Sequence, residues 1–526
     1  MNAWFSGADH KKTGLLYIFA SISFFIAGGM EAMAMRVQLA MPNLHVLTPQ
    51  LYNQIFTMHG TTMIFLVVTP VLTGFGLYMT PLMIGADRLS FPWAGIVGLF
   101  LHLLGGILLY ASFATGSAPD AGWFSYAPLT ERTFSPGTGL DFWAVALLLI
   151  SAGAILAAIN LIVTIATKRV PGMTMRRVPL FVWMMLVTSV MIVFAQPVLM
   201  AALVMLLSDR LLSGSFFDAA RGGSPLLWQH FFWIFGHPEV YIMILPAFGM
   251  ISEVIPVFSR QPIFGYSLVA SSSVAIAFLS YGVWAHHMFA VALGKTFLSI
   301  FAASSMLIAV PTGVKIFNWI ATIWGGSIQL TTSMLFAIAF LLEFTIGGLS
   351  GVAFAAIPID WQLTDSYFVV AHIHYVLFGG SIFALFAGVY YWFPKMSGHM
   401  LDEKFGRWHF WLVVIGFNGT FFVQHFLGLL GMPRRIYSYP DLPGYGALNL
   451  ISTISAAILT FGIVIFFANL LVGLQFGKAA GNNPWNAWTL EWATASPPPT
   501  PAFDEIPPIR GRRPLWDLAH PPEESA

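Results

Sequence analysis

The chain has 526 residues, of which 57% are hydrophobic and only 9% are charged, and its mean hydropathy is +0.78. Because a soluble domain carries roughly 25% charged residues, this composition indicates a membrane protein. The 23 Lys and Arg residues balance the 22 Asp and Glu residues, which gives no electrostatic reason to expect a nucleic-acid partner. The sequence contains no Cys, which excludes thiolate metal sites, iron–sulfur clusters and cysteine nucleophiles.

Uninterrupted apolar stretches of about 20 residues predict an all-α bundle of twelve transmembrane helices. The predicted spans are 14–38, 52–82, 94–116, 141–167, 181–207, 226–258, 264–292, 297–317, 329–358, 366–394, 406–430 and 447–475. An even number places both termini on one side of the membrane. Twelve Lys and Arg residues lie in loops on the side of the termini and six lie in loops on the opposite side. Because cytoplasmic loops carry the excess of Lys and Arg, this distribution predicts cytoplasmic termini.

The chain divides into three predicted parts. Residues 1–13 form a cytoplasmic N-terminus without a cleavable signal, so we expect the first span itself to direct insertion. Residues 14–475 form the twelve-helix core. Residues 476–526 form a tail rich in Pro, which we expect to be extended and to lie on the cytoplasmic surface.

Six histidines fall within the predicted spans, where an ionisable side chain costs on the order of 2.5–3.5 kcal/mol at the membrane centre and indicates function. They are His59 in the second span, His237 in the sixth, His286 and His287 in the seventh, and His372 and His374 in the tenth. A single buried His is more often structural. Six of them on four helices, in a chain without Cys, favour metal or haem ligation.

Helical geometry separates these histidines into centres. His372 and His374 are two residues apart and therefore rotated by about 200°, so we expect them to face different centres, each compatible with a haem between helices. His59 can complete a bis-imidazole site with one of them. His286 and His287, about 100° apart, can share an ion only with a local distortion or at a helix terminus. With His237 they would form a three-imidazole copper site, a ligand set that zinc also accepts.

Tyr241 lies four residues after His237 and so on the same face of the predicted helix. A phenol in this position could supply a proton and an electron to a molecule bound at the metal. An ordinary core aromatic is the competing interpretation.

Three stretches resemble the signatures of a known family. Residues 228–241, which include Trp233, residues 309–315 and residues 370–375 resemble the haem–copper oxidases, and specifically subunit I of the aa3-type cytochrome c oxidases. The resemblance covers about residues 15–475. It implies the catalytic subunit of a respiratory terminal oxidase that reduces O2 to water with electrons from cytochrome c and couples this reaction to proton uptake and pumping. The implied partners are a copper-bearing subunit II and a subunit III. The extended, proline-rich tail favours a bacterial plasma membrane over a mitochondrial inner membrane.

The resemblance also assigns cofactor ligands by position. His59 and His374 would bind the low-spin haem a, His372 the high-spin haem a3, and His237, His286 and His287 the copper ion that faces it, copper B, with Tyr241 covalently linked to His237. Trp233 would lie against the cofactors. Arg434 and Arg435 would pair with haem propionates. Arg36 would hydrogen-bond the haem a formyl group, a position that a snorkelling arginine could also take.

Proton carriers follow from the same resemblance. Lys315, with Thr312 beside it and Ser305 and Ser252 as helpers, resembles the lysine of the family's K channel. Glu239 resembles the glutamate at the head of the D channel.

The mouth of the D channel departs from the family pattern. Arg88 occupies the position of the usual aspartate, and Asp87 comes one residue early. Leu77, Gly95 and Ile96 replace the channel asparagines, and Gly153 and Ala154 replace its serines, although Asn160 remains. We therefore hypothesise that this pathway is altered or closed at its mouth.

Two further features bear on ligands and donor. Thr364 stands where the family places a magnesium-binding His, so that Asp365 alone remains and magnesium is doubtful. Leu51 and Ala27 stand where quinol oxidases typically place a His and an Arg, which favours cytochrome c over a quinol as donor. A proton-coupled secondary transporter with twelve spans is the alternative from another class.

Overall fold

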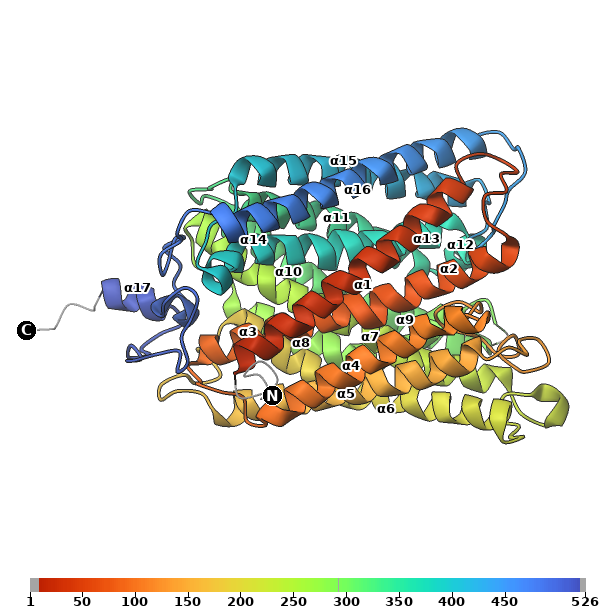
Figure 1. Ribbon diagram of the computed structural model, residues 1–526, viewed down its shortest axis with the longest axis horizontal. Helices are drawn as coiled ribbons and strands as arrows, with labels where there is room; N and C mark the ends of the chain where they lie inside the picture. The colour runs from red at the N-terminus through yellow and green to blue at the C-terminus, as the bar shows by residue number, and fades with distance from the viewer. Residues whose placement is uncertain (1–8, 292, 521–526) are drawn as a thin grey trace, which may run out of the picture.

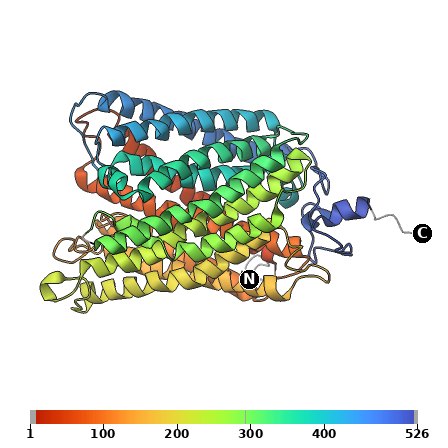
Figure 2. The ribbon, with the colours of Figure 1, turned by 180° about the vertical axis from the view of Figure 1, so that it is seen from behind.

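The computed structural model describes residues 9–291 and 293–520. Long helices run along the bundle, and both described ends of the chain lie at the same end of it (Figures 1 and 2). Lys11 Nζ donates to Thr500 Oγ1 at 2.8 Å and so joins the two terminal segments directly. The predicted placement of both termini on one side is confirmed.

The described chain is helical, with two isolated β-bridges and no strand. Its α-helices are α1 (His10–Gln38), α2 (Pro49–Thr61), α3 (Thr69–Ile84), α4 (Pro92–Ala111), α5 (Gly139–Thr167), α6 (Leu180–Leu211), α7 (Pro225–Ser259), α8 (Tyr266–Ser280), α9 (Lys295–Leu307), α10 (Ala309–Ile323), α11 (Thr332–Ala355), α12 (Ile357–Leu363), α13 (Tyr367–Val376), α14 (Phe383–Ser397), α15 (Glu403–Leu429), α16 (Tyr445–Phe476) and α17 (Pro514–Ala519). Shorter segments are the π-helical η1 (Thr62–Val68) and η5 (Leu377–Ile382), and the 3-10 turns η2 (Ser112–Thr115), η3 (Ala219–Arg221), η4 (Trp284–Met288) and η6 (Leu490–Ala493).

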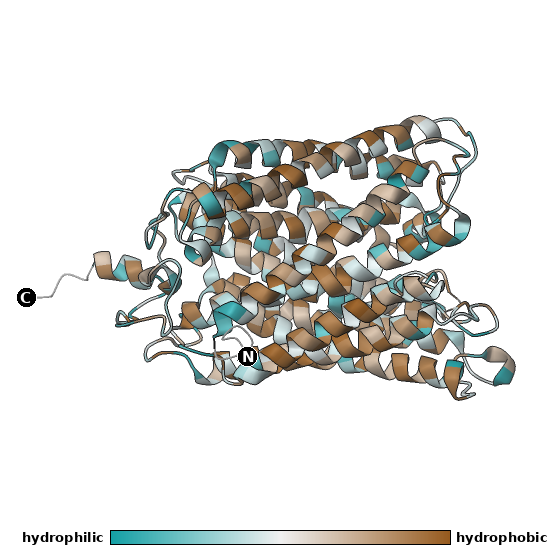
Figure 3. Cartoon of the chain, viewed as in Figure 1, coloured by the Kyte–Doolittle hydropathy of each residue, from teal (hydrophilic) through white to brown (hydrophobic). Residues whose placement is uncertain are grey.

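Eleven segments of residues 9–291 and 293–520 are long and apolar enough to cross a membrane, and α8 is a shorter apolar helix. Together they correspond in order to the twelve predicted spans. Figure 3 shows hydrophobic residues along the length of these helices, with hydrophilic residues gathered towards the two ends of the bundle. The predicted fold class, an all-α membrane bundle, is confirmed.

The seventh predicted span, 264–292, is wrong as a continuous helix. α8 ends at Ser280, and His286 and His287 lie in the 3-10 turn η4. Tyr281 and Gly282 interrupt the helix as a turn. The local distortion that two adjacent histidines need for a shared ion is therefore present in the backbone.

The C-terminal tail packs against the terminal end of the bundle and contains η6 and α17. Leu490 and Glu491 are fully buried. Lys395 at the end of α14 donates through Nζ to the Thr494 carbonyl at 2.6 Å and to the Asn482 carbonyl at 3.0 Å. The tail is thus tied to the core by buried hydrogen bonds.

Helices α1 and α3 touch at two glycines. A Cβ at Gly14 would lie 2.6 Å from the Gly74 carbonyl oxygen, and a Cβ at Gly74 would lie 2.8 Å from the Gly14 carbonyl oxygen. Only glycine at both positions allows this backbone contact.

Gly14→Ala should therefore force α1 away from α3 and destabilise the protein by about 1–3 kcal/mol, as overpacking does. Gly29→Ala, in the same helix but with no heavy atom within 4 Å of the new Cβ, is the matched control. Thermal denaturation of the purified complex should show a lower midpoint for the first variant only. Equal midpoints would contradict the close contact.

Candidate functional site

Three imidazoles from α7 and η4 converge on one point. The ligand-capable atoms of His237, His286 and His287 all lie within 4.8 Å of one another. His237 Nδ1 and His286 Nε2 are each 3.2 Å from His287 Nε2. No other group of three or more His, Cys, Asp or Glu residues in the described chain is arranged this way.

Neighbouring side chains fix two of these rings. His286 Nδ1 lies 2.7 Å from Ser305 Oγ, whose own proton goes to the Phe301 carbonyl, so His286 donates and its Nε2 keeps a lone pair. The His287 ring stacks on Trp233 at a centroid distance of 3.8 Å and an interplanar angle of 11°. Trp233 Nε1 in turn donates to the Tyr126 hydroxyl. Such outer contacts orient metal-binding imidazoles.

His237 lies beside Tyr241 and has one ring nitrogen without a hydrogen-bond partner. Its Nε2 is buried without a hydrogen-bond partner, while Nδ1 faces the cluster. The Tyr241 ring lies 4.8 Å from the His237 ring at 60°, as expected from their spacing of four residues.

The donor set of this cluster fits a divalent or monovalent copper ion. Neutral imidazoles whose acceptor nitrogens point at one another repel unless a cation lies between them. Three imidazoles without thiolate suit copper, and also zinc.

A second pair of imidazoles faces across the space between α2 and α13. The His59 and His374 rings are 6.5 Å apart and nearly parallel, at 11°. His59 Nδ1 lies 2.9 Å from the Gly28 carbonyl and His374 Nδ1 lies 2.8 Å from the Val370 carbonyl, so Nδ1 donates in both. Each Nε2 keeps its lone pair. Metal–nitrogen bonds of about 2 Å on opposite sides of one ion place two imidazole centroids about 6 Å apart, which this pair satisfies.

His372 faces a different direction from His374, as its spacing predicts. Its Nδ1 lies 3.0 Å from the Gly347 carbonyl and 2.9 Å from Ser350 Oγ. A Cβ at Gly351 would lie 2.9 Å from His372 Cε1, so glycine there makes room for the ring. His372 is therefore held in one tautomer with Nε2 available.

Three arginines are predicted to contact the cofactors. Arg36 is buried and donates through Nη2 to Asn449 Oδ1 at 2.9 Å, while its Nε has no partner. Arg434 pairs with Asp365 Oδ1 at 2.6 Å. Asp365 is therefore engaged in an ion pair, and it is not a member of the three-histidine group.

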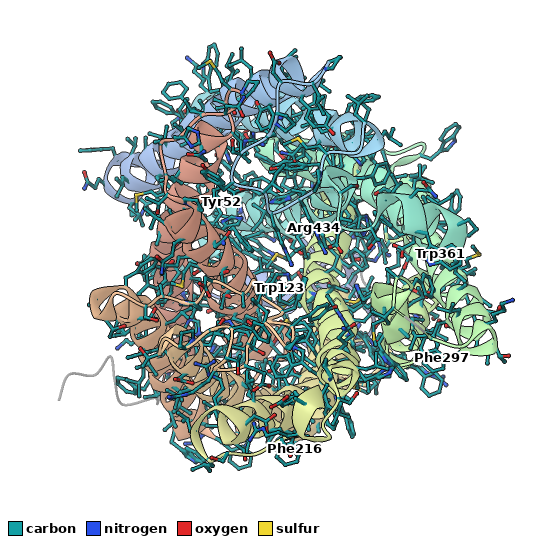
Figure 4. All side chains as sticks on the ribbon, turned by 90° about the vertical axis from the view of Figure 1, so that its right-hand side faces the viewer. Tyr52, Trp123, Phe216, Phe297, Trp361 and Arg434 are labelled. Atoms are coloured by element: carbon teal, nitrogen blue, oxygen red, sulfur yellow. The ribbon has the colours of Figure 1, made fainter. Side chains whose placement is uncertain are left out.

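Arg435 stacks its guanidinium on Phe124 at 3.9 Å. Burial, reinforced by the neighbouring Arg434, lowers the pKa of Arg435 to about 9. Figure 4, which looks along the bundle from the end opposite the termini, shows Arg434 and Trp123 towards the middle and Phe216 and Trp361 nearer the rim. Two cations so close together and partly desolvated would be stabilised by an anionic group.

Comparison with known proteins decides the family. Residues 12–458 match the model of the family described as cytochrome c and quinol oxidase polypeptide I. The chain belongs to this family. It is 50% identical over 521 residues to a putative cytochrome c oxidase subunit 1-beta of Streptomyces coelicolor, covering 98% of this chain and 90% of that protein. It is 49% identical over 511 residues to cytochrome c oxidase subunit 1 of Bacillus subtilis, covering 97% and 82%.

The fold agrees with this membership. A haem–copper terminal oxidase dimer solved by cryo-EM matches with a TM-score of 0.75 at 18% identity, over 89% of this chain and 84% of that one. As a family member, the chain is the catalytic subunit of a terminal oxidase. The family binds haem and copper, and the two histidine arrangements fit these groups.

The proton-carrying candidates of the oxidase lie in two separate places. Lys315 is fully buried and donates through Nζ to Ser273 Oγ at 2.5 Å and to the Val269 carbonyl at 2.8 Å. Thr312 donates to the Ile308 carbonyl of its own helix. Glu239, also buried, accepts from Thr69 Oγ1 at 2.9 Å and from Gln196 Nε2 at 3.3 Å.

The two helper serines predicted for Lys315 have other partners. Ser305 contacts His286, and Ser252 accepts from Trp319 Nε1 at 3.0 Å. Sequence reasoning missed the side chains that hydrogen-bond Lys315 and Glu239, of which Ser273 contacts Lys315, and Thr69 and Gln196 contact Glu239. The signal for Ser273 and Gln196 is the clearest. Both are polar residues within apolar spans, and polar residues in such spans indicate function, so the sequence alone could have identified them. Ser273 ends a run of three serines, and Gln196 precedes Pro197.

The histidine cluster leads to a direct test. His287→Ala should remove one of three ligands and lower copper content about tenfold or more, because a lost ligand weakens metal affinity at least as much as a lost outer partner. His102→Gln, a buried histidine of α4 outside the cluster, is the control. Elemental analysis of both purified variants checks the result. Unchanged copper in His287→Ala would exclude the cluster as the copper site.

Proposed function

We propose that this subunit reduces O2 to water with electrons from cytochrome c, delivered through a copper-bearing subunit II, and couples the reaction to proton uptake and pumping. The observation that carries the proposal is the three-imidazole cluster combined with the parallel His59–His374 pair. The names of the relatives, cytochrome c oxidase subunit 1, support the choice of donor.

We assign low-spin haem a to His59 and His374, high-spin haem a3 to His372, and copper B to the cluster. The haem held by His372 and the copper ion held by the cluster would supply the coordination positions at which O2 is reduced and would pass on the electrons that arrive from cytochrome c. The hydrogen bonds on Nδ1 keep Nε2 of His59, His372 and His374 unprotonated and aimed at the bound groups. Magnesium is left out of the assignment because Asp365 is paired with Arg434.

Arginines would hold the charged and polar edges of the haems. Arg434 and Arg435 present two guanidiniums side by side, which suits propionate carboxylates. Arg36 has a buried Nε without a partner, which suits a formyl oxygen. Trp233 keeps His287 in its orientation through the stacked contact.

Tyr241 is placed to donate a proton and an electron at the copper site. Its ring lies 4.8 Å from the His237 ring, and His237 Nε2 is buried without a hydrogen-bond partner, which together support the covalent link between the two side chains. The link would fix the phenol in one position relative to the metal.

Two buried residues supply protons in this proposal. Lys315 carries them along α10 with Ser273 as its nearest hydroxyl, and Thr312 lies one helical turn before it. Glu239 carries them from the α3 and α6 side through its contacts with Thr69 and Gln196. Pumped protons work against about 2.3 kcal/mol per charge for every 100 mV of membrane potential.

We place the protein in a bacterial plasma membrane with both termini in the cytoplasm and a subunit III beside it. The excess of Lys and Arg in loops at the terminal end supports this orientation. Residues 1–13 and 476–526 are then cytoplasmic and residues 14–475 form the catalytic core.

The optical spectrum of the purified complex tests the cofactor assignment. Reduced-minus-oxidised spectra with pyridine haemochrome analysis should give two haems A per chain, of which one binds CO, because only His372 leaves the sixth iron position open. His374→Ala should lose the low-spin band. Haem B or O, with oxidation of a quinol and not of cytochrome c, would contradict cytochrome c as the electron donor. A colourless protein would contradict the assignment of both haems.

The Lys315 contact yields a second test. Ser273→Ala removes the hydroxyl that accepts from Nζ and should slow anaerobic reduction of the CO-binding haem about tenfold, a modest share of what positioned proton transfer contributes. Ser272→Ala is the matched control, since this neighbouring buried hydroxyl donates only to its own helix. Equal rates in the two variants would remove Ser273 from the pathway.

A further inference from the structure

A small cavity lies between α3, α5, α6 and α7, next to the contacts of Glu239. It is lined by Thr69, Leu72, Thr73, Ala158, Leu161, Met185, Thr188, Ser189, Ile192, Ile242 and Pro246. It has room for about one water molecule. Four of its lining residues carry hydroxyls in an otherwise apolar region of the membrane.

Two of these hydroxyls have no protein partner. Thr188 Oγ1 and Ser189 Oγ are buried and unpaired, and the two residues are 3% and 1% exposed. Buried hydroxyls are normally hydrogen-bonded, to protein or to water. A polar cavity with several convergent groups is where buried water binds.

The remaining polar groups connect the cavity to the catalytic side. Thr73 Oγ1 donates to the Thr69 carbonyl at 2.9 Å. Thr69 Oγ1 in turn donates to Glu239 Oε1 of α7 at 2.9 Å. Gln196, two turns after Thr188 on α6, has a buried Oε1 without a partner. Polar groups on α3 and on α6 thus lie between the cavity and Glu239, which both Thr69 and Gln196 contact.

The positions of the family's channel serines lack hydroxyls in this chain, and α4 and α5 are in backbone contact at one of them. A Cβ at Gly153 would lie 2.6 Å from the Gly98 carbonyl oxygen, so α5 and α4 touch where channel serines would stand. Asn160 is occupied at both ends of its amide, accepting from the Phe91 N–H at 3.0 Å and donating to the Phe91 carbonyl at 2.8 Å.

We propose that the cavity is a water-binding site that delivers protons to the O2-reducing centre along α6, with Thr188 and Ser189 as its proton-relaying residues. This inference rests on the proposed function. Each hydroxyl accepts a proton on its oxygen from the bound water and releases its own to the next acceptor, so one proton passes and nothing is oxidised or reduced. Thr69 Oγ1 then accepts the proton and releases its own to the Glu239 carboxylate, the acceptor of its hydrogen bond, while Gln196 holds the other carboxylate oxygen.

The test compares variants of the complete purified complex. Thr188→Val keeps the shape of the side chain and removes its hydroxyl, and Ser189→Ala does the same for its neighbour. The double variant should take up protons about tenfold or more slowly after O2 is added to the fully reduced complex, as a pH-indicator dye reports. Thr188→Ser retains the hydroxyl, so a second double variant that combines it with Ser189→Ala should take up protons at the wild-type rate.

Two controls separate the inference from folding and from the proposed function. Ser259→Ala removes an equally buried, unpaired hydroxyl of α7 outside the cavity and should leave uptake unchanged. Haem content and CO binding should be unchanged in every variant. Normal uptake in the double variant would overturn the water site, whereas a wild-type complex without haem would overturn the proposed function.

Discussion

The imidazoles at the centre of the bundle are fixed by a hydrogen bond on one ring nitrogen, and this constraint governs the rest of the structure. The acceptors are the carbonyl of Gly28 for His59, that of Val370 for His374, that of Gly347 for His372 and the hydroxyl of Ser305 for His286. Each bond selects the tautomer whose Nε2 carries a lone pair, so the dry interior presents only acceptors to whatever lies between the rings. A cation or an iron macrocycle is the chemical complement of such a surface.

The helices depart from regular α geometry where they carry these ligands. The π-helical η1 begins three residues after His59, and η5 begins three residues after His374. An extra residue in a helical turn rotates the side chains that follow relative to those that precede it, and such turns are frequent at functional sites. His286 and His287 also lie outside regular α-helix, in the short 3-10 turn η4 that follows the break at Tyr281 and Gly282.

Much of this arrangement could be predicted from sequence because membrane insertion leaves a strong signal in composition and spacing. The twelve spans, the shared side of the termini, and the division of His372 from His374 all follow from length and helical rotation. The end of α8 at Ser280 could not be predicted, because an apolar stretch continues through a break in the helix. Backbone contacts such as Gly98 with Gly153 depend on how two helices cross, which sequence periodicity does not encode.

The buried ammonium of Lys395 has a consequence for biosynthesis. It sits at the end of α14 over the Trp492 ring, and its acceptors are carbonyls of the tail, of which that of Thr494 is 99 residues further along the chain. Until the ribosome has made α15, α16 and the tail, this charge has only water or lipid head groups to satisfy it. The Lys395 ammonium can therefore gain its buried acceptors only after α15 and α16 have been made, so this part of the bundle is completed late in synthesis.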